Sequence, residues 1–329
     1  MKKSKWLFLP LMMMSTMITI SSNNWISMWM GLELNMMFFI PLMMKDINKS
    51  SSEASMMYFF TQSTSSIIML MMMTINTYNY YINNMTINLI ITISLLIKLG
   101  AAPFHLWMPE IMSKMKWSKC IILMTWQKVA PLMLISNSQM NELLINLSIF
   151  LSIIIGSIGG INQTSLRKMM SYSSINHLGW MLTINKSMNS WIIYLAIYSI
   201  MVLMICYTFM KYKLYFINQI NNINMTMMDK TSMFMMMLSM GGLPPFIGFL
   251  PKWITIQCMI NEKQFLLITV MILFSLITLM YYMRIMTSLM LTFSTSIKWV
   301  TIKSNKMMTL LIIMINTSLP LILMMDLFS

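Results

Sequence analysis

The chain has 329 residues, of which 58% are hydrophobic and 9% are charged, and its formal net charge is +14. This composition excludes an ordinary water-soluble domain, in which about a quarter of the residues are charged. The basic residues do not indicate nucleic-acid binding, because they are spread between apolar segments and form no patch with interleaved aromatic residues. The composition therefore indicates a membrane protein.

Apolar segments bounded by polar residues recur along the whole chain. Each is long enough, as a helix rising about 1.5 Å per residue, to cross a hydrocarbon core of about 30 Å. The alternating pattern of a transmembrane β-strand is not visible. The sequence predicts an all-α polytopic membrane protein with about eleven transmembrane helices. In chain order they lie near residues 6–22, 25–44, 54–75, 86–108, 118–136, 143–161, 165–184, 190–210, 232–254, 264–290 and 306–326.

Basic residues are distributed very unequally between the two sets of loops that these helices define. The side on which the chain begins, here called the N side, has sixteen of them, whereas the opposite side has only Lys186 and Lys263. Because basic loops stay in the compartment of synthesis, we expect the N-terminus to face it and Ser329 to lie opposite. The sixteen are Lys2, Lys3, Lys5, Lys45, Lys49, Lys114, Lys116, Lys119, Arg167, Lys168, Lys211, Lys213, Lys230, Lys298, Lys303 and Lys306.

Residue usage indicates where the protein is made. Methionine occurs 50 times, whereas arginine occurs only as Arg167 and Arg284. This bias is typical of an A/T-rich genome that reads an extra codon as methionine, as animal mitochondria do. The N-terminal residues show neither a small-residue cleavage site nor an arginine-rich transit pattern. The sequence therefore predicts a multi-pass protein of the mitochondrial inner membrane, with its N-terminus in the matrix and its C-terminus on the intermembrane-space side.

Two segments share the pattern Gly-x-x-Pro-Phe-x-x-x-x-Pro, from Gly100 to Pro109 and from Gly242 to Pro251, with an offset of 142 residues. They lie in the fourth and ninth predicted helices, so they would enter the membrane with opposite polarity. The pattern predicts two inverted five-helix repeats, residues 1–137 and 138–292, followed by a C-terminal helix within 293–329.

Each copy of this pattern predicts a discontinuous helix, with breaks near residues 98–109 and 240–252. Glycine and proline interrupt the helical hydrogen bonds, and backbone groups freed at membrane depth are tolerated only where protein buries them or water reaches them. Broken helices at matching positions of inverted halves are typical of a transport pathway near the membrane midplane. The alternative is a pair of kinks that only assist packing.

Four ionisable residues lie well inside the predicted helices: Glu33, Lys98, Lys128 and Lys252. Each would cost about 2.5–3.5 kcal/mol if it faced lipid, so we expect all four to face the protein interior or water. Burial favours the neutral form of a lysine and a nearby carboxylate favours the charged form. Approach and separation of Glu33 and Lys98 could thus load and unload a proton. The alternative is a static ion pair that fixes helix register.

Other polar residues are weaker candidates for proton transfer. His177 lies in the polar stretch SYSSINHLGW, where it could join a water path or only link helices through hydrogen bonds. With the offset of 142, Lys252 occupies the position in the second copy that Glu110 occupies in the first. This suggests Lys252 as a terminal proton site and Glu110 as a surface residue. His105 could cap the first break, and Arg284 has no assigned role.

No residues for cofactor or redox chemistry are recognisable in the sequence. The three cysteines, Cys120, Cys206 and Cys258, are far apart and lack metal-binding or redox spacing. No phosphate-binding loop, metal cluster, flavin or haem motif, or nucleophile triad is present. We therefore expect this chain to bind no cofactor and to carry out no electron transfer itself.

Five segments together resemble mitochondrial NADH dehydrogenase subunit 2, one of the antiporter-like, proton-pumping subunits of respiratory complex I. The segments are WMGLELN, KLGAAPFHLWMPE, MTWQKVAPLML, GGINQTSLRKMMSYSSINHLGWML and GGLPPFIGFLPKW, and the resemblance covers about residues 6 to 290. The methionine-rich composition is similar to that of insect members. Beyond about residue 295 no motif matches, and only a hydrophobic helix is expected.

This resemblance implies roles for particular residues. Glu33, Lys98, Lys128 and Lys252 match the charged axis of the family, and His177 lies in its connecting water path. It also implies proton translocation across the inner membrane, coupled to NADH oxidation and ubiquinone reduction by other subunits that hold NADH, FMN, iron–sulfur clusters and ubiquinone. The implied partners are other membrane-arm subunits and lipids, with protons as the translocated species.

Two other functions are compatible with the same sequence. A stand-alone cation/proton antiporter would have similar buried lysines, although the organellar composition favours the complex I subunit. A structural scaffold subunit of the membrane arm would use the charged residues only for helix register, and removal of Lys128 would then harm assembly rather than pumping.

Overall fold

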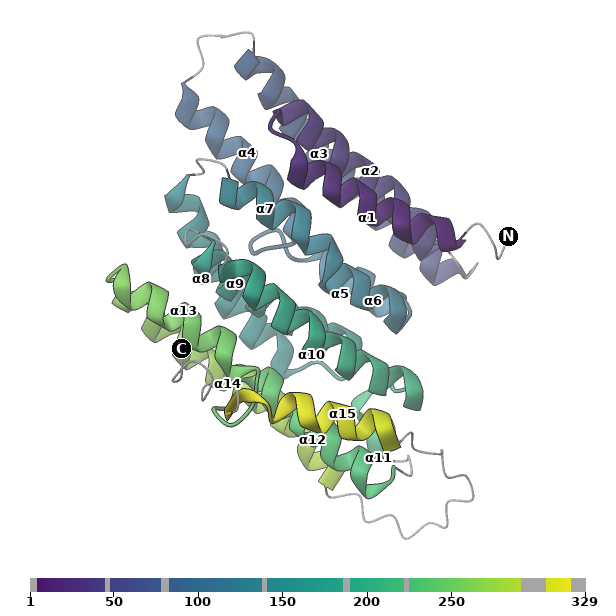
Figure 1. Cartoon of the computed structure of the whole chain (residues 1–329). Helices are drawn as coiled ribbons and strands as arrows, with labels where there is room; N and C mark the ends of the chain where they lie inside the picture. Colours follow the sequence, from purple (N-terminus) through teal and green to yellow (C-terminus); the bar gives the residue numbers. More distant parts are fainter. Residues whose placement is uncertain are drawn as a thin grey trace.

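Helices follow one another along the whole described part of the chain in the computed structural model (Figure 1). The structure describes residues 5–44, 48–77, 83–137, 141–185, 190–221, 225–290 and 306–320. Within these ranges the β pairing is limited to an isolated antiparallel bridge between Ser165 and Phe216. The predicted all-α class is therefore confirmed for the described residues.

The described N-terminal part of the chain, up to residue 137, contains the helices α1 to α7 and a 3-10 helix. They are α1 (Lys5–Ser21), α2 (Trp25–Met43), α3 (Lys49–Thr77), α4 (Asn84–Leu99), α5 (Trp107–Lys114), α6 (Trp117–Met124), the 3-10 helix η1 (Trp126–Lys128) and α7 (Val129–Asn137). The C-terminal part consists of α8 (Glu142–Ile161), α9 (Leu166–Ile184), α10 (Ser190–Tyr212), α11 (Ile217–Asn221), α12 (Met227–Gly241), α13 (Phe249–Asn261), α14 (Phe265–Met290) and α15 (Lys306–Asn316).

Five segments of the described chain are long and apolar enough to span a membrane. They are Trp25–Met43, Trp117–Asn137, Glu142–Ile161, Ser190–Tyr212 and Phe265–Met290. The outer faces of these helices are also apolar, since Leu266, Leu273 and Met280 of α14 are 61–69% exposed. Apolar surface of this extent is unfavourable in water but is solvated by lipid. The helices are therefore those of a multi-pass membrane protein.

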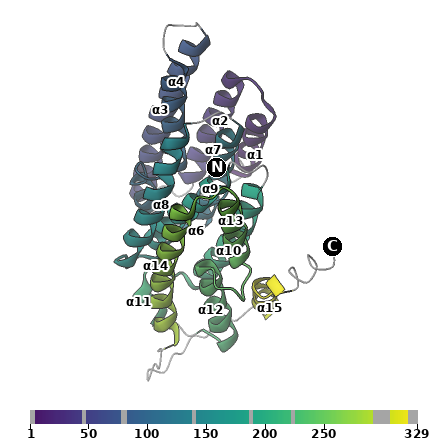
Figure 2. The same cartoon turned by 90° about the vertical axis from the view of Figure 1, so that its left-hand side faces the viewer.

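The helices are packed side by side with roughly parallel axes in an elongated bundle (Figures 1 and 2). Helices α1 to α3 form one end, and α12, α14 and α15 lie at the other. The two parts of the chain meet in the middle, where α5 contacts α9, α6 contacts α10 and α4 contacts α8. These helices form the junction between the two parts of the chain.

Both predicted breaks are present in the structure. Helix α4 ends at Gly100, which has a φ angle of 69°, and the chain turns before α5 begins. Helix α12 ends at Gly242, with a φ angle of 78°, before α13. These are left-handed conformations, which glycine adopts without the steric penalty of a side chain. The two glycines of the repeat therefore end their helices in the same way.

A third interruption lies within the fifth predicted helix, which we had expected to be continuous over residues 118–136. The structure divides it at Thr125 into α6, the 3-10 turn η1 and α7. Pro131 explains the position, because proline lacks an amide hydrogen and its ring clashes with the carbonyl four residues earlier, that of Gln127. The tightened turn carries Lys128, so this break too positions a charged residue.

Two lysines predicted to lie in N-side loops instead bind neighbouring helix ends. Lys119 is only 6% exposed, and its Nζ donates a hydrogen bond to the carbonyl oxygen of Met43 at the end of α2 (2.8 Å). A cation is favourable there because the C-terminal end of a helix has partial negative charge. Lys114 Nζ lies 3.0 Å from the Glu53 carboxylate, and this hydrogen bond and charge lower the pKa of that carboxyl.

Candidate functional site

Lys98 lies in the last turn of α4, directly before the first break, and is 8% exposed. The indole of Trp107, at the start of α5, folds back over this break. Its Nε1 donates to the carbonyl oxygen of Ile97 (3.2 Å), which also accepts a hydrogen bond from the amide of Gly100 where α4 ends. The break is thus covered by protein, and Lys98 is held in the interior.

Replacing Gly100 with alanine should destabilise the protein, because the new Cβ would lie 2.9 Å from the ring of Trp107 in a left-handed backbone conformation. That conformation alone costs a non-glycine residue about 1–2 kcal/mol. Gly241→Ala is a matched control, since its Cβ would lie 3.4 Å or more from the side chain of Leu279. We expect a lower midpoint of thermal unfolding for Gly100→Ala in detergent. Equal midpoints for the two variants would contradict this account of the break.

An internal cavity lies between Lys98 and Lys128 and is lined by both side chains. It has about 20 Å³ of space for the centre of a water molecule, enough for about one water. Its other polar lining residues are Asn35, Tyr58, Gln62 and Gln127. The two buried lysines therefore share a small polar space.

The polar lining of this cavity is held by hydrogen bonds between helices α2, α3 and η1. Gln127 Nε2 donates to Asn35 Oδ1 (3.1 Å), and the Tyr58 hydroxyl donates to Gln127 Oε1 (3.2 Å). Gln62 Nε2 donates to the backbone carbonyl of Lys98 (3.4 Å). Because these side chains are fixed by one another, the oxygens and amides beside the lysines have defined positions.

Glu33 lies on α2 and is partly exposed. Among the described residues it forms no ion pair with Lys98, although its charge is close enough to interact favourably with that of the lysine. The two side chains are therefore not in direct contact in this structure. Glu33 can act on Lys98 through space without direct contact.

Lys128 is 2% exposed and occupies the last position of η1. Its Nζ donates to the carbonyl oxygen of Ser174 on α9 (3.0 Å) and lies 5.0 Å from the centre of the Tyr198 ring. The carbonyl and the ring face both stabilise a cation at this position. Lys128 therefore connects the cavity on the Lys98 side with helices α9 and α10 of the C-terminal part.

His177 lies on α9 and continues from Lys128 toward the second break. Its Nδ1 is 2.8 Å from the Tyr194 hydroxyl, and its ring centre is 4.8 Å from that of Tyr198. Lys128 contacts Ser174, which is three residues before His177 on the same helix. Lys252 lies over Trp180, which is three residues after it. The histidine therefore lies between the two lysines, and its ring packs against the same tyrosine as Lys128.

Lys252 lies on α13, just after the second break, and is 6% exposed. Its Nζ donates to the carbonyl oxygen of Gly241 (2.7 Å) and lies 5.5 Å from the ring centre of Trp180. In the first break a side chain also binds a carbonyl at the helix end, since Trp107 donates to Ile97. Lys252 therefore both caps the end of α12 and ends the row of basic residues.

Three weaker candidates lie away from this row. Glu110 is exposed in the first turn of α5, as expected from the sequence. His105 is within the first break, where its Nδ1 lies 3.2 Å from the carbonyl oxygen of Pro103, a local contact. Arg284 donates to the backbone carbonyls of Ile161 and Gln163. It thereby links α14 to the turn between α8 and α9.

The sequence analysis missed the uncharged members of the site: Asn35, Gln62, Gln127, Tyr194 and Tyr198. The sequence could have indicated two of them as site residues, because each is a polar residue beside a charged one inside an apolar segment. Asn35 follows Glu33 by two residues, and Gln127 directly precedes Lys128. The others come from α3 and α10, which carry no buried charge. Their place in the site depends on tertiary packing.

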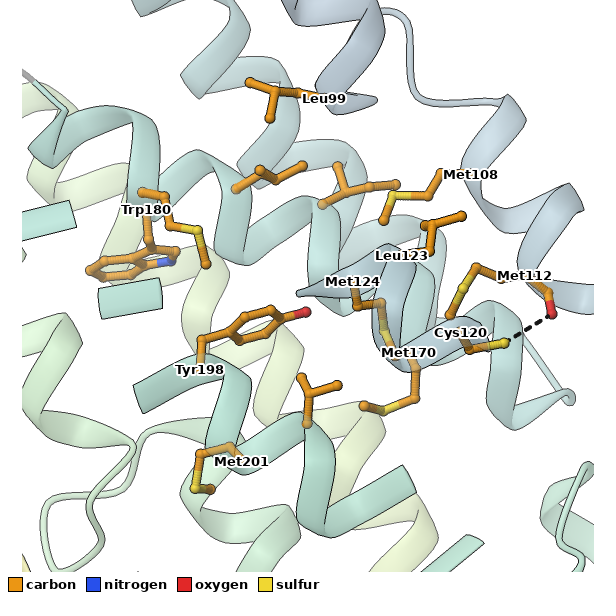
Figure 3. Close-up of a cluster of buried hydrophobic side chains, with 14 of the residues drawn as sticks. Leu99, Met108, Met112, Cys120, Leu123, Met124, Met170, Trp180, Tyr198 and Met201 are labelled. Atoms are coloured by element: carbon orange, nitrogen blue, oxygen red, sulfur yellow. Dashed lines mark hydrogen bonds between the residues drawn. The ribbon is translucent and has the colours of Figure 1, made fainter. Parts of the chain in front are cut away.

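Metal-binding clusters are absent from the residues that the structure describes, since no three His, Cys, Asp or Glu side chains lie together. Cys120 and Cys206 are buried and Cys258 is partly buried. Figure 3 shows Cys120 in a methionine-rich cluster, where its Sγ contacts the carbonyl oxygen of Met112 at 3.7 Å. The cysteines that the structure shows are packing residues in a helical core.

Comparison with known proteins identifies the family. Residues 22–278 match the transmembrane family of NADH:quinone oxidoreductase and Mrp antiporters. NADH-ubiquinone oxidoreductase chain 2 of Anopheles gambiae is 42% identical over 294 residues, covering 87% of this chain and 86% of the relative. The protein of the same name from Aedes aegypti is 44% identical over 328 residues, covering 95% of both.

A solved structure has the same fold. A chain of respiratory complex I from Thermus thermophilus with bound Aureothin superimposes with a TM-score of 0.81, at 17% identity, and the match covers 94% of this chain and 75% of that one. This similarity supports the fold alone, whereas the insect relatives are similar in sequence over nearly their whole length. The chain therefore belongs to the NADH-ubiquinone oxidoreductase chain 2 family, within the NADH:quinone oxidoreductase and Mrp antiporter transmembrane proteins.

Proposed function

We propose that this chain is a membrane-arm subunit of respiratory complex I that moves protons across the mitochondrial inner membrane. NADH oxidation and ubiquinone reduction take place in other subunits, which hold the NADH, FMN, iron–sulfur clusters and ubiquinone. The observation that carries the proposal is a row of basic residues across the centre of the bundle, the buried Lys98, Lys128 and Lys252 and the half-buried His177. Membership of this complex is supported by the similar insect proteins, which are named NADH-ubiquinone oxidoreductase chain 2.

Each residue of this row can hold and release a proton at a defined atom. A lysine accepts a proton on the lone pair of neutral Nζ and releases it when its surroundings no longer favour the cation. A water in the cavity between Lys98 and Lys128 could pass the proton from one Nζ to the next. His177 can then accept on one ring nitrogen and donate from the other, toward Lys252.

We propose the architecture expected from the sequence: eleven transmembrane helices in two inverted five-helix repeats, residues 1–137 and 138–292, with a further helix in 293–329. Matching neighbours in the two parts support this. Helix α1 packs on α2 as α8 packs on α9, and α2 packs on α3 as α9 packs on α10. Helix α3 contacts both halves of the first broken helix, α4 and α5, as α10 contacts α12 and α13.

The proposed location and orientation rest on the loop charges. The N-terminus would lie in the matrix and the C-terminus on the intermembrane-space side, because sixteen basic residues belong to the N side and two to the other. A protease added to the intermembrane face of intact inner membranes should leave an N-terminal epitope uncut. Rapid loss of that epitope would contradict the orientation.

Native gel electrophoresis of detergent-solubilised inner membranes, followed by mass spectrometry, tests membership of the complex. We expect the chain to migrate with the band that oxidises NADH, together with other membrane-arm subunits. Migration alone, near its own mass of 38.5 kDa plus detergent, would contradict the proposal. It would favour a stand-alone cation/proton antiporter, the second candidate, which the inclusion of Mrp antiporters in the matching family also supports.

A further inference from the structure

Three buried tyrosine hydroxyls lie beside the row of charged residues without belonging to it. Tyr198 is on α10, whereas Tyr281 and Tyr282 are on α14, and each is at most 2% exposed. None of the three hydroxyls has a hydrogen bond of acceptable geometry within the described part of the chain. An unsatisfied buried hydroxyl costs about 1–3 kcal/mol, so three in one region need a physical explanation.

These hydroxyls are close to one another and to two serines of α9. The ring centres of Tyr281 and Tyr282 are 4.7 Å apart. The Tyr282 hydroxyl interacts with Ser173, and the Tyr198 hydroxyl interacts with Ser174. Both serine hydroxyls donate to backbone carbonyls one turn earlier in their own helix, each at 2.7 Å. Their oxygens therefore remain available as acceptors for a neighbouring tyrosine hydroxyl.

One end of this cluster reaches Lys128. Its Nζ donates to the backbone carbonyl of Ser174 and lies over the ring of Tyr198. Figure 3 shows the Tyr198 hydroxyl directed toward Met124. Because methionine sulfur is only a weak acceptor, the strongest proton acceptors near this hydroxyl are Ser174 and, when neutral, Lys128.

The other end of the cluster lies beside the end of α8, where the ring of Tyr281 packs against Gly160. Tyr281 is one helical turn from Arg284, which donates to the carbonyls of Ile161 and Gln163 in the turn between α8 and α9. Residues 161 and 162 of this turn are exposed. By the loop assignment from the sequence, the turn lies on the N side. The hydroxyls therefore lie between the end of α8, next to this exposed turn, and Lys128.

We propose that Tyr281, Tyr282, Ser173 and Tyr198 form a proton-uptake branch that connects the α8–α9 turn with Lys128. The inference rests on the proposed function and adds a route by which Lys128 is loaded. Each hydroxyl accepts a proton on its oxygen and releases its own proton to the next acceptor, with bridging water where two oxygens are too far apart. One O–H bond forms as another breaks, every relay residue stays neutral, and Nζ of neutral Lys128 gains the proton.

The glycine at the end of α8 offers an independent way to disturb this branch. A Cβ at Gly160 would lie 2.8 Å from Cε1 of the Tyr281 ring, so Gly160→Ala should displace that ring while keeping all hydroxyls. We expect Gly160→Ala to slow proton translocation in the same direction as removal of the Tyr281 hydroxyl. Full translocation despite a displaced ring would count against the relay.

The decisive experiment removes single hydroxyls in the assembled complex, with Tyr281→Phe and Tyr282→Phe. Phenylalanine keeps the ring and its packing, so native gels should show normal assembly. We expect the rate of NADH-driven proton translocation per complex to fall at least about tenfold, since positioned proton-transfer groups contribute about a hundredfold or more. Tyr207→Phe on α10 is the control, because Tyr207 is partly exposed and should leave the rate unchanged.

A parallel Lys128→Met variant separates failure of the branch from failure of the proposed function. If Lys128→Met slows translocation while both tyrosine variants remain normal, the uptake branch is wrong and the proposed function stands. If Lys128→Met also pumps normally, the proposed function is wrong. An equal loss in Tyr207→Phe would show a general effect of removing tyrosine hydroxyls and would overturn the assigned relay.

Discussion

Lys128→Met should lower the rate of proton translocation per complex at least about tenfold and leave the complex assembled. Lys128 joins the polar cavity beside Lys98 to helix α9, and methionine cannot carry a proton across that point. Methionine is similar to lysine in length and needs no charge partner, so the interior that holds Lys128 at 2% exposure should accept it. Proton release measured against NADH oxidised, with native gels for assembly, checks both parts.

Two further variants decide whether Lys128 acts through its proton or only through its charge. Arginine keeps a positive charge but does not release its proton in proteins. Lys128→Arg should therefore translocate protons as slowly as Lys128→Met. If Lys128 had only a structural role, Lys128→Arg should pump normally. Lys116→Met changes an exposed lysine on the N side and should pump normally. Loss of assembly in Lys128→Met with normal pumping in Lys128→Arg would favour the scaffold function.

Lys98→Met should lower proton translocation as strongly as Lys128→Met, and Glu33→Gln should lower it less. Lys98 lines the cavity directly, whereas Glu33 acts on it through space without an ion pair. Removing the carboxylate takes away a charge that favours protonated Lys98, so coupled turnover slows. The measurement is NADH:ubiquinone turnover together with the proton-to-electron ratio in the assembled enzyme.

A double variant tests whether these two residues work together. If Glu33 acts only by favouring a proton on Lys98, the Glu33→Gln and Lys98→Met double variant should be no slower than Lys98→Met alone. Losses that multiply would instead assign Glu33 a separate role. Glu142→Gln is the matched control, because Glu142 is exposed at the start of α8. Unchanged turnover and ratio in both single variants would overturn the proton-transfer role of the pair.

Much of this site could be predicted because the bilayer restricts what a sequence can contain. A charged residue inside an apolar helix is so unfavourable in lipid that Lys98, Lys128 and Lys252 had to be buried, and each is at most 8% exposed. The glycines of the repeat likewise predicted where two helices end, because a helix end in the left-handed conformation favours glycine. Gly100 and Gly242 both do so, at the positions given by the repeat.

Other features depended on residues that carry no such restriction. The 3-10 turn that carries Lys128 was missed, although Pro131 could have indicated it, because a single proline is also common in continuous membrane helices. Asn35, Gln62 and Gln127 are uncharged, so their place beside the cavity follows only from the packing of α2, α3 and η1.

The sequence by itself determined the membrane environment, the two breaks and the burial of the lysines, because each of these follows from the local cost of placing a polar or flexible residue in lipid. The tertiary structure decided which buried groups meet. It placed Lys98 and Lys128 on one cavity, His177 between Lys128 and Lys252, and Glu33 outside direct contact. Such contacts join helices far apart in the chain, and their distances depend on packing across the whole bundle.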